Sequence, residues 1–489
     1  MSFRDSFRSR PALLAGPGGL MAGTALTLTA ASASPLVALA AAGGLAIAVA
    51  VTLFPVAGFL LTAAVIPVER IGRLTSDASM YTVSLMRIVG LLALASFLAH
   101  ALVRKWKLHF GAAFFVYAAY CALGALTIFY TSDRLGAARG ASATIGNLLF
   151  FFLVINVARS WRLAEGAVVA WLVVTALIGA YTIYDWHLGR SVAEQEIGMT
   201  GERLSTVFED KSEWEALGKS VARATGPTSH AAVYGINLVM TLPFFVYFFR
   251  TRRRRLWKAA AAGGGLIAAY NIVLTNTRAT LLLAGVVIAL CLARRLLKLT
   301  LAQLLPVAFA GAALLAFIPG AVYERVFDLS NYTYQRSGTY RIRLEYWNAG
   351  LAIAEEHWLT GIGLGNKNTI PRYLKGYGPE QTSVHNDYLQ TFIEVGLIGW
   401  LCFFGFVGLI FWRSVRAAAR WRRGEAGAQY WFLIACQIAM IAVLLDGLQV
   451  DVFHFPLKGW WLVAGLSCVM YRIAPAGRGA PESVDALKE

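Results

Sequence analysis

Charged residues are scarce in this sequence, and positive charges outnumber negative ones. Asp, Glu, Lys and Arg make up 15% of the 489 residues, whereas hydrophobic residues make up 58%. Ordinary soluble domains carry about 25% charged residues, so this composition excludes that class and indicates a membrane protein. The net charge is +17. The basic residues stand largely in short clusters between apolar runs, which is typical of cytoplasmic loops, so we expect no nucleic-acid partner.

Several catalytic and metal-binding motifs are missing. No two aspartates stand two residues apart, so the sequence has no DxD motif to hold a divalent metal with a sugar diphosphate. It has no HExxH or GxSxG motif, and GIGLGN at Gly361 to Asn366 lacks the Lys-Ser/Thr of a nucleotide-binding loop. The five cysteines lie scattered in apolar runs and are expected to be packing residues. We therefore expect no metal and no other cofactor.

Apolar runs long enough to cross a bilayer as helices follow one another along the chain, without the alternating pattern of a membrane β-barrel. The expected fold is all-α, a polytopic membrane protein of about 12 transmembrane helices. One crossing is expected within residues 11–67, with 12–34 partly in the membrane interface; three crossings there would give 14 spans. The other spans are expected at about 82–103, 108–130, 141–158, 162–184, 229–249, 256–274, 278–295, 301–320, 388–412, 428–449 and 456–472.

The main basic connectors set the expected orientation, because with these spans they all fall on one side. They are Arg104–Lys107, Arg159–Arg162, Arg250–Lys258, Arg294–Lys298 and Arg413–Arg423. The positive-inside rule makes that side the cytoplasm and puts two long polar segments on the outer face. The expected organisation is N-terminal transmembrane helices in 1–184, a periplasmic loop in 185–228, transmembrane helices in 229–320, a large helical periplasmic loop in 321–387, C-terminal transmembrane helices in 388–472 and a cytoplasmic tail in 473–489.

The larger outer loop contains a stretch with helical periodicity. Within residues 341–358, the apolar residues Leu344, Trp347, Leu351 and Ala354 stand at helical spacing. The pattern predicts a helix, and two placements remain open. One is a helix lying on the membrane surface, and the other is an ordinary packed helix outside the membrane.

Polar residues open the next expected span. His385 precedes it, Asn386 or Asp387 can cap it, and Gln390 and Glu394 fall four residues apart on one helix face. Ionisable groups in such a segment are costly and usually functional. Histidine titrates near neutral pH, so His385 is a candidate general base. The alternative is a capped helix whose glutamate is satisfied by a neighbouring helix.

Arginines stand at or near the outer mouths of several spans. Arg278 opens a span in NTRATLL, Arg223 and His230 flank a Gly-Pro turn, and Arg341 and Arg343 lie on the expected loop helix. A guanidinium group binds phosphate through two parallel hydrogen bonds, so Arg223, Arg278 and Arg343 are candidates for an anionic substrate. The alternative for Arg278 is an arginine that extends to the lipid headgroups.

The ordered set of these motifs resembles the O-antigen ligase and polymerase superfamily. The likeness covers roughly residues 220–410. The motifs are H-N-x-x-L-Q-x-x-x-E-x-G-x-x-G at His385–Gly399, R-x-x-x-W at Arg343–Trp347, G-x-G-x-G at Gly361–Gly365, Thr277–Arg278 at a span entrance, and R-x-x-G-P followed by His230. At this last motif the sequence reads His-Ala-Ala where His-Pro-Asn is frequent in the family, which puts a role for His230 in doubt.

The resemblance implies a multi-pass glycosyltransferase of the bacterial inner membrane with its active site facing the periplasm. Its donor would be a glycan on undecaprenyl pyrophosphate and, in a ligase, its acceptor would be the lipid A-core oligosaccharide. His385 would be the general base on the acceptor hydroxyl, and Arg278 and Arg223, with Arg343 as a third candidate, would hold the pyrophosphate. The supporting residues would be Asn386, Gln390, Glu394, Arg341 and His230.

Alternatives remain open inside and outside this superfamily. The His-Asn form and the single large loop favour a ligase, while a polymerase that extends the lipid-linked chain is the next reading. A protein O-oligosaccharyltransferase is a further relative. Outside the enzymes, the competing class is a transporter of small anions, in which an internal repeat with paired broken helices is common; the sequence shows no convincing repeat.

Overall fold

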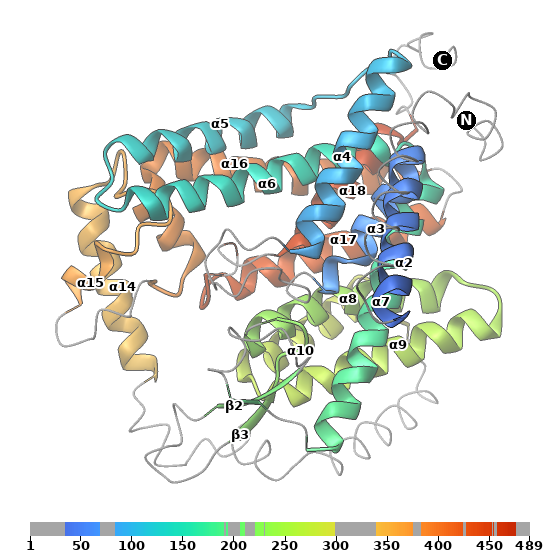
Figure 1. The fold of residues 1–489 in the computed structure, drawn as a ribbon. Coiled ribbons are helices and arrows are strands. Elements are labelled where there is room, and N and C mark those ends of the chain that lie inside the picture. Colours follow the sequence, from blue (N-terminus) through green and yellow to red (C-terminus); the bar gives the residue numbers. More distant parts are fainter. Residues whose placement is uncertain are drawn as a thin grey trace.

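The computed structural model describes residues 35–68, 84–189, 192–193, 206–210, 221–228, 230–298, 339–374, 383–423, 427–451, 453 and 457–475. Helices dominate this part of the chain (Figure 1), and seven of them are long and apolar enough to cross a membrane. The expected all-α membrane fold is confirmed. The number of 12 crossings stays a prediction, because the expected span at 301–320 and residues 11–34 lie outside the described residues.

The described helices match most of the expected spans closely. Short 3-10 turns, η2 (Ile66–Val68) and η3 (Thr127–Phe129), follow α3 and α5. The helices are α2 (Pro35–Leu53), α3 (Pro55–Ala64), α4 (Leu85–Val103), α5 (Ala112–Leu126), α6 (Arg134–Val157), α7 (Trp161–His187), α8 (Ala231–Thr251), α9 (Arg255–Leu274), α10 (Arg278–Ala293), α14 (Thr339–Glu356), α15 (Ile370–Tyr373), α16 (Asp387–Arg423), α17 (Gly427–Asp446) and α18 (Lys458–Arg472).

Short polar residues and one proline set several helix starts. Ser84 caps α4, Asp133 caps α6 and Ser160 caps α7, each accepting a hydrogen bond from the backbone N–H three residues ahead. Such caps satisfy donors that have no partner inside the helix. Pro55 stands at the first position of α3, where its missing N–H costs nothing. These local signals explain why the helix starts follow the sequence so closely.

Basic connectors gather at one end of the helix bundle, which we call the basic end. Arg250, near the end of α8, donates to the carbonyl oxygen of Arg295 beyond α10 (2.6 Å) and lies 3.8 Å from the ring centroid of Trp431 in α17. Arg252 pairs with Glu165 near the start of α7 (3.0 Å). The connectors between α6 and α7, between α8 and α9 and after α10 therefore share one end, as expected. Its identification as the cytoplasmic side stays a prediction.

The opposite end, which we call the loop end, carries a small sheet that the sequence did not predict. Strands β1 (Val192–Ala193), β2 (Val207–Asp210) and β3 (Val221–Ala224) pair in the order β1-β2-β3, parallel and then antiparallel. Figure 1 shows β2 and β3 near α10. Thr206, just before β2, donates to the Asp185 carboxylate in α7 (2.9 Å). This contact ties the sheet to the bundle.

The helix predicted in the larger loop is present as α14, but its buried face differs from the expected stripe. Leu344 and Leu351 are 37% and 53% exposed. The buried residues are Tyr346, Ala349 and Ile353, which pack in a second apolar cluster with side chains of α16. These three also follow helical spacing, so periodicity alone could not choose between the two faces. The predicted helix is therefore present, and its placement on the membrane surface or as an ordinary packed helix stays a prediction.

Glycine 396 interrupts α16. Its φ of 66° and ψ of −174° are not helical, and glycine adopts such angles far more readily than other residues. An unbroken helix of 37 residues would be about 55 Å long, whereas the hydrocarbon core of a bilayer is about 30 Å thick. The observed helix thus differs from the expected span at 388–412 in two ways. It breaks at Gly396, and it continues to Arg423 through the expected basic connector.

The GIGLGN turn at Gly361 to Asn366 sits against this break. The N–H of Ile362 donates to the carbonyl of Ile393 (2.8 Å), and the N–H of Gly363 donates to the carbonyl of Glu394 (2.9 Å). A Cβ at Gly361 would lie 2.5 Å from the Glu394 carbonyl oxygen, so only glycine allows this approach. The loop therefore supplies donors to carbonyls that the broken helix leaves without helical partners.

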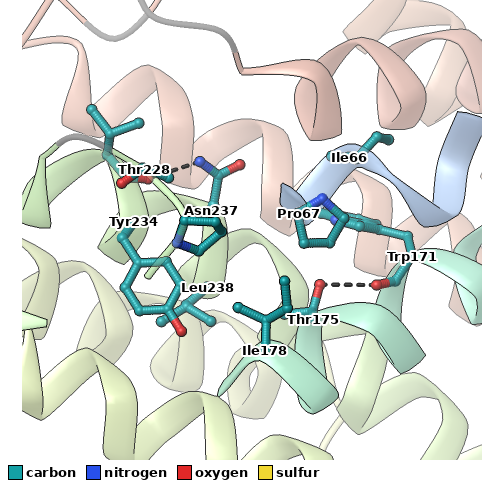
Figure 2. Close-up of a pocket in the computed structure, with 11 residues that line it drawn as sticks. Ile66, Pro67, Trp171, Thr175, Ile178, Thr228, Tyr234, Asn237 and Leu238 are labelled. Atoms are coloured by element: carbon teal, nitrogen blue, oxygen red, sulfur yellow. Dashed lines mark hydrogen bonds between the residues drawn. The ribbon is translucent and has the colours of Figure 1, made fainter. Parts of the chain in front are cut away.

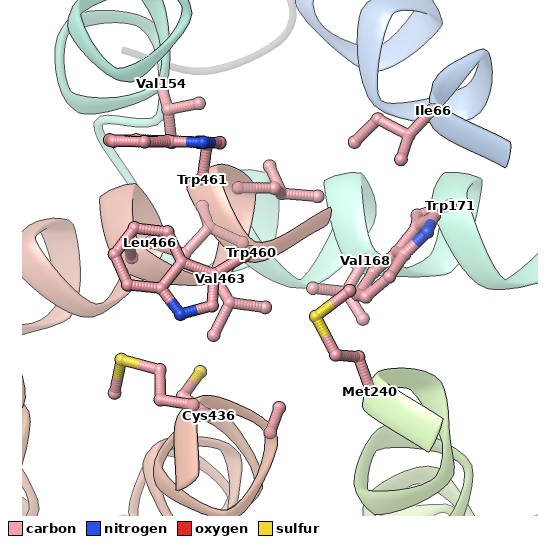
Figure 3. Packing of buried hydrophobic residues seen from close by; sticks show 14 of the residues in the cluster. Ile66, Val154, Val168, Trp171, Met240, Cys436, Trp460, Trp461, Val463 and Leu466 are labelled. Atoms are coloured by element: carbon pink, nitrogen blue, oxygen red, sulfur yellow. The ribbon is translucent and has the colours of Figure 1, made fainter. Parts of the chain in front are cut away.

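A small cavity lies between η2, α7 and α8, next to the turn that follows β3 (Figure 2). The interior nearby is otherwise densely packed. Figure 3 shows Trp460 of α18 and Trp171 of α7 among aliphatic side chains, and both indoles are 1% exposed. Cys436, in the same region, is free and buried, as expected of a packing residue. The bundle thus forms a rigid frame below the loop end.

Candidate active site

His385 stands just before α16 and is held by contacts from two other segments. Its imidazole Nδ1 lies 3.2 Å from Oδ1 of Asp451, and its ring centroid lies 5.8 Å from that of Tyr346 in α14. The His385 side chain is 40% exposed, whereas that of Asp451 is 11% exposed. A carboxylate at Nδ1 favours the tautomer with the proton there, which leaves the lone pair on Nε2. The half-exposed imidazole is thus oriented to accept a proton.

Two neighbours of His385 complete this arrangement. Its backbone has a φ of +51°, and its N–H donates to Oγ of Ser383 (3.1 Å). Burial, and secondarily the adjacent Glu345 carboxylate, raises the pKa of the Tyr346 phenol above its ordinary value. Tyr346 therefore stays neutral beside the imidazole across the physiological range. We call His385, Asp451 and Tyr346 the histidine group.

Sequence reasoning missed Asp451. It lies in the connector between α17 and α18, 66 residues after His385, within LDGLQVD at the end of an apolar run. Acidic residues at such a position, here Asp446 and Asp451, were a signal that could have been used, since charge near a membrane segment is usually functional. No spacing rule connects so distant a residue with His385, so its partner could not be identified.

Asn386 and Asp387, at the start of α16, hold this helix against the connector between α17 and α18. Asn386 is the cap, because its Oδ1 accepts from the N–H groups two and three residues ahead, both at 3.0 Å. Its amide also donates to the Leu448 carbonyl (3.1 Å). The buried Asp387 accepts from the N–H of Phe453 (3.1 Å) and donates its own N–H to the Gly447 carbonyl (2.8 Å). The connector that carries Asp451 is thereby held against His385.

Gln390 and Glu394 lie inside the protein and bond to each other. They are 2% and 1% exposed, and the Gln390 amide donates to the Glu394 carboxylate at 2.7 Å. Gln390 also accepts from the N–H of Val384, which immediately precedes His385 (3.0 Å). These two polar side chains of α16 therefore have hydrogen-bond partners within the chain. Both residues support the backbone that positions His385.

Arg223 contacts the segment that directly precedes Arg278, although the two arginines lie far apart in the sequence. Arg223, on β3, donates through Nε to the Thr275 carbonyl (3.2 Å) and through Nη2 to Oγ1 of Thr277 (3.0 Å). Thr277 is the N-cap of α10, and Arg278 is its first residue. A helix N-terminus carries partial positive charge, which adds to that of the guanidinium groups. We call Arg223, Thr277 and Arg278 the arginine group, and its chemistry suits an anion.

Asn276, which sequence reasoning missed, lies directly before Thr277 of the arginine group. It has a φ of +49° and is fully buried, and within the described residues neither amide atom of its side chain has a hydrogen-bond partner. Asparagine tolerates the left-handed conformation better than most residues. The turn between α9 and α10 depends on that conformation. A residue of this type directly before Thr277 was the only available signal.

Arg343 lies with the histidine group rather than with the other two arginines. Its Nη1 is 3.5 Å from Oε1 of Gln449, in the connector that also carries Asp451. Arg341 lies on α14 two residues earlier, and its side chain is outside the described part. Arg343 thus lies against the connector that carries Asp451. Its expected contact with pyrophosphate stays a prediction.

His230 serves a local purpose. It is the N-cap of α8, and its Nδ1 accepts from the N–H of Ala232 (3.2 Å). This contact gives it a structural role, and its supporting role in the site stays a prediction. Within the described residues, no group of three or more His, Cys, Asp or Glu side chains is placed to hold a metal ion. The metal-free reaction stays a prediction.

The histidine group and the arginine group both lie at the loop end of the bundle. Helices α10 and α17 pack together, and Arg294 at the end of α10 donates to Gln437 within α17 (3.2 Å). The two helices run in opposite directions, since α10 leads to the basic end and α17 leaves from it. The start of α10, with Arg278, and the end of α17, which leads to Asp451, therefore point to the same side.

Comparison with known proteins agrees with the motifs. A family model described as O-antigen ligase matches residues 263–404, from within α9 to within α16. The matched region contains Arg278, Arg343 and His385, whereas Arg223 and Asp451 lie outside it. No curated protein matches the chain at a significant level. The match confirms the resemblance found in the sequence.

Proposed function

Because residues 263–404 form an O-antigen ligase family domain in a multi-pass membrane protein, we propose that the chain is an O-antigen ligase of the bacterial inner membrane. It moves a glycan from undecaprenyl pyrophosphate to the lipid A-core oligosaccharide on the periplasmic side. The family supports lipid-linked glycans as substrates in general. The observation that carries the proposal is the His385–Asp451 pair at 3.2 Å, at the end of the bundle that also bears Arg278.

In the proposed reaction, His385 is the general base. Nε2 takes the proton of an acceptor hydroxyl as the sugar oxygen forms its bond to the anomeric carbon of the donor. The bond between that carbon and the pyrophosphate oxygen breaks, and its electron pair leaves with undecaprenyl pyrophosphate. The Asp451 carboxylate stabilises the imidazolium that forms. One displacement of this kind inverts the anomeric configuration and needs no enzyme nucleophile.

The arginine group stabilises the leaving pyrophosphate. Negative charge grows on its oxygens as the glycosidic bond breaks, and fixed cations at that point lower the barrier without rearranging. Arg223 is already oriented by its contacts with Thr275 and Thr277, beside Arg278. Two guanidinium groups together with a helix N-terminus can neutralise this charge, so the proposal needs no metal ion.

A deletion strain distinguishes this function from its nearest alternative. In a strain without the gene, a ligase predicts lipopolysaccharide that lacks all long chains, with lipid-linked polymer accumulating. A polymerase predicts a core that carries one repeat unit. Complementation with wild type and His357→Ala should restore long chains, whereas His385→Ala should not. His357 is the matched control because it is an exposed histidine of the same loop. Long chains restored by His385→Ala would reject the base role.

A further inference from the structure

Arginines from three helical segments converge at the basic end, beside the connector between α4 and α5. Arg159 follows α6, Arg413 lies in α16 and Arg472 ends α18. A Cβ at Gly111 in the connector would lie 3.3 Å from Nη1 of Arg413 and 3.6 Å from Nε2 of His109. Partial burial, and then the charges of Arg472 and Arg413, lower the pKa of His109 below its ordinary value. Both arginines therefore act on this imidazole, and we call Arg159, Arg413 and Arg472 the connector cluster.

The last turn of α6 holds two of these arginines side by side. Nη1 of Arg472 donates to the carbonyl of Ile155 (2.9 Å). Nε of Arg159 donates to the carbonyl of the next residue, Asn156 (3.0 Å). The Asn156 side chain also accepts from the N–H of His109 (2.7 Å) and donates to its carbonyl (3.1 Å). Neutral oxygens thus fix the arginines and the connector in place without cancelling the positive charge.

The charge of the connector cluster is not balanced by a carboxylate within the described residues. Nε of Arg413 is buried and has no hydrogen-bond partner in the part of the chain that the structure describes. A buried donor without a partner costs free energy, and neighbouring like charges repel each other. A bound anion would remove both costs. The connector cluster is therefore suited to an anionic ligand from outside the chain.

Exposed apolar and aromatic side chains border the connector cluster. Phe110 of the connector and Trp412, which precedes Arg413 in α16, are both exposed. The guanidinium carbon of Arg159 lies 4.9 Å from the ring centroid of Trp106 in the connector. Tryptophan is typical of the boundary between hydrocarbon and headgroups, where arginines extend to lipid phosphates. The anion that fits these surroundings is therefore attached to acyl chains rather than dissolved in water.

We propose that the connector cluster binds the phosphate of an anionic phospholipid in the membrane leaflet at the basic end. Phosphate oxygens accept paired hydrogen bonds from guanidinium groups, and basic pockets between transmembrane helices bind lipid headgroups in this way. Phosphatidylethanolamine also carries a phosphate, but its ammonium group would stand among arginines, so the cluster favours a headgroup without a cation. The bound lipid joins α6, α16 and α18 to the connector between α4 and α5. This site lies at the opposite end of the bundle from the proposed glycan transfer and does not depend on it.

Lipid binding to the purified full chain in detergent tests the proposal. Native mass spectrometry counts the lipids bound during titration with phosphatidylglycerol or phosphatidylethanolamine. The tightest site should bind phosphatidylglycerol about tenfold more tightly, and inorganic phosphate at the same concentration should not displace it. Equal affinity for the two lipids would overturn the proposal. Displacement by inorganic phosphate would also overturn it, because the site would then take a soluble anion.

A set of arginine variants locates the binding. Arg413→Gln and Arg472→Gln, on different helices, should each weaken phosphatidylglycerol binding about tenfold, because each removes charge-assisted hydrogen bonds to the phosphate. Arg253→Gln is the matched control, since it removes the same charge from an exposed arginine at the same end. Thermal unfolding without added lipid selects the variants that are folded. Equal affinity in the control and in a folded cluster variant would assign the binding to the general positive charge of this end and reject the connector cluster.

Discussion

The histidine group and the arginine group are held by opposite kinds of partner. Asp451, a carboxylate, contacts His385, whereas carbonyl and hydroxyl oxygens of Thr275 and Thr277 orient Arg223. A carboxylate favours the charged form of an imidazole, while neutral oxygens orient a guanidinium without cancelling its charge. A group proposed to accept a proton and a group proposed to stabilise negative charge therefore have different surroundings. Because the two groups lie on separate elements, one chain can provide both surroundings.

Removing the base should have the largest effect and should leave the arginine group intact. His385→Ala is expected to lower glycan transfer by about 10²–10⁴-fold, since it removes proton abstraction. Binding of undecaprenyl pyrophosphate should remain near wild type. Transfer with purified protein, lipid-linked donor and lipid A-core acceptor measures the first, and equilibrium binding measures the second. Wild-type transfer by folded His385→Ala would remove the histidine group from the reaction.

Arg278 tests the other side of the comparison. Arg278→Ala should lower transfer by about 10²–10³-fold, because the growing charge on the leaving group loses a partner. Arg278→Lys should recover little, since lysine keeps the charge but lacks the planar fork. Binding of undecaprenyl pyrophosphate should weaken in both variants, in contrast to His385→Ala. Full activity of Arg278→Lys would reduce Arg278 to a general cation.

Asp451 separates positioning from chemistry within the histidine group. Asp451→Asn should lower transfer by about 10–100-fold, because the amide no longer stabilises the imidazolium and can favour the wrong tautomer. Binding of undecaprenyl pyrophosphate should remain near wild type, because the arginine group is unchanged. Glycan transfer and equilibrium binding, measured for both proteins, separate the two roles. A parallel loss of binding and transfer would indicate a purely structural role.

The smallest expected effect concerns the backbone below the arginine group. Asn276→Gly keeps the left-handed conformation available and should transfer within about threefold of wild type, whereas Asn276→Ala is expected to lose about 1–2 kcal/mol of stability. Thermal unfolding in detergent and pyrophosphate binding measure the pair. If Asn276→Ala and Asn276→Gly behaved alike, the conformation would not be the reason for asparagine.

Local signals in the sequence predicted much of the fold. Hydropathy located most of the described spans, because each bilayer crossing needs a long apolar run. Helix α6 begins before its expected span, and α16 continues beyond its own. Capping chemistry located the start of α16 with Asn386 or Asp387 as the cap, of which the structure has Asn386. The positive charges identified the connectors that share one end. These features depend on neighbours in the chain. His385, Arg223 and Arg278 could be selected as candidates for the same reason.

Features that depend on distant segments could not be predicted. The pairing of Asp451 with His385 and of Arg223 with Thr277 joins residues 66 and 54 positions apart. Which stripe of α14 packs against α16 could not be chosen, because helical periodicity fits two stripes and α16 decides between them only in the folded state. The break at Gly396 leaves no mark in hydropathy, since both halves are apolar. Tertiary contacts decide such questions.

The GIGLGN turn fits into the break of α16, so a chimera has to exchange these two segments together. Residues 358–363, which lead into and begin the turn, share backbone hydrogen bonds with residues 393–397, including that from the Leu397 N–H to the Trp358 carbonyl (2.8 Å). A Cβ at Gly361 or at Gly396 would meet the other segment's backbone. A chimera that takes its outer loop from a relative therefore inherits a mismatch unless 393–397 come with it. In recombination between relatives, the outer loop and residues 393–397 of α16 therefore have to be transferred together.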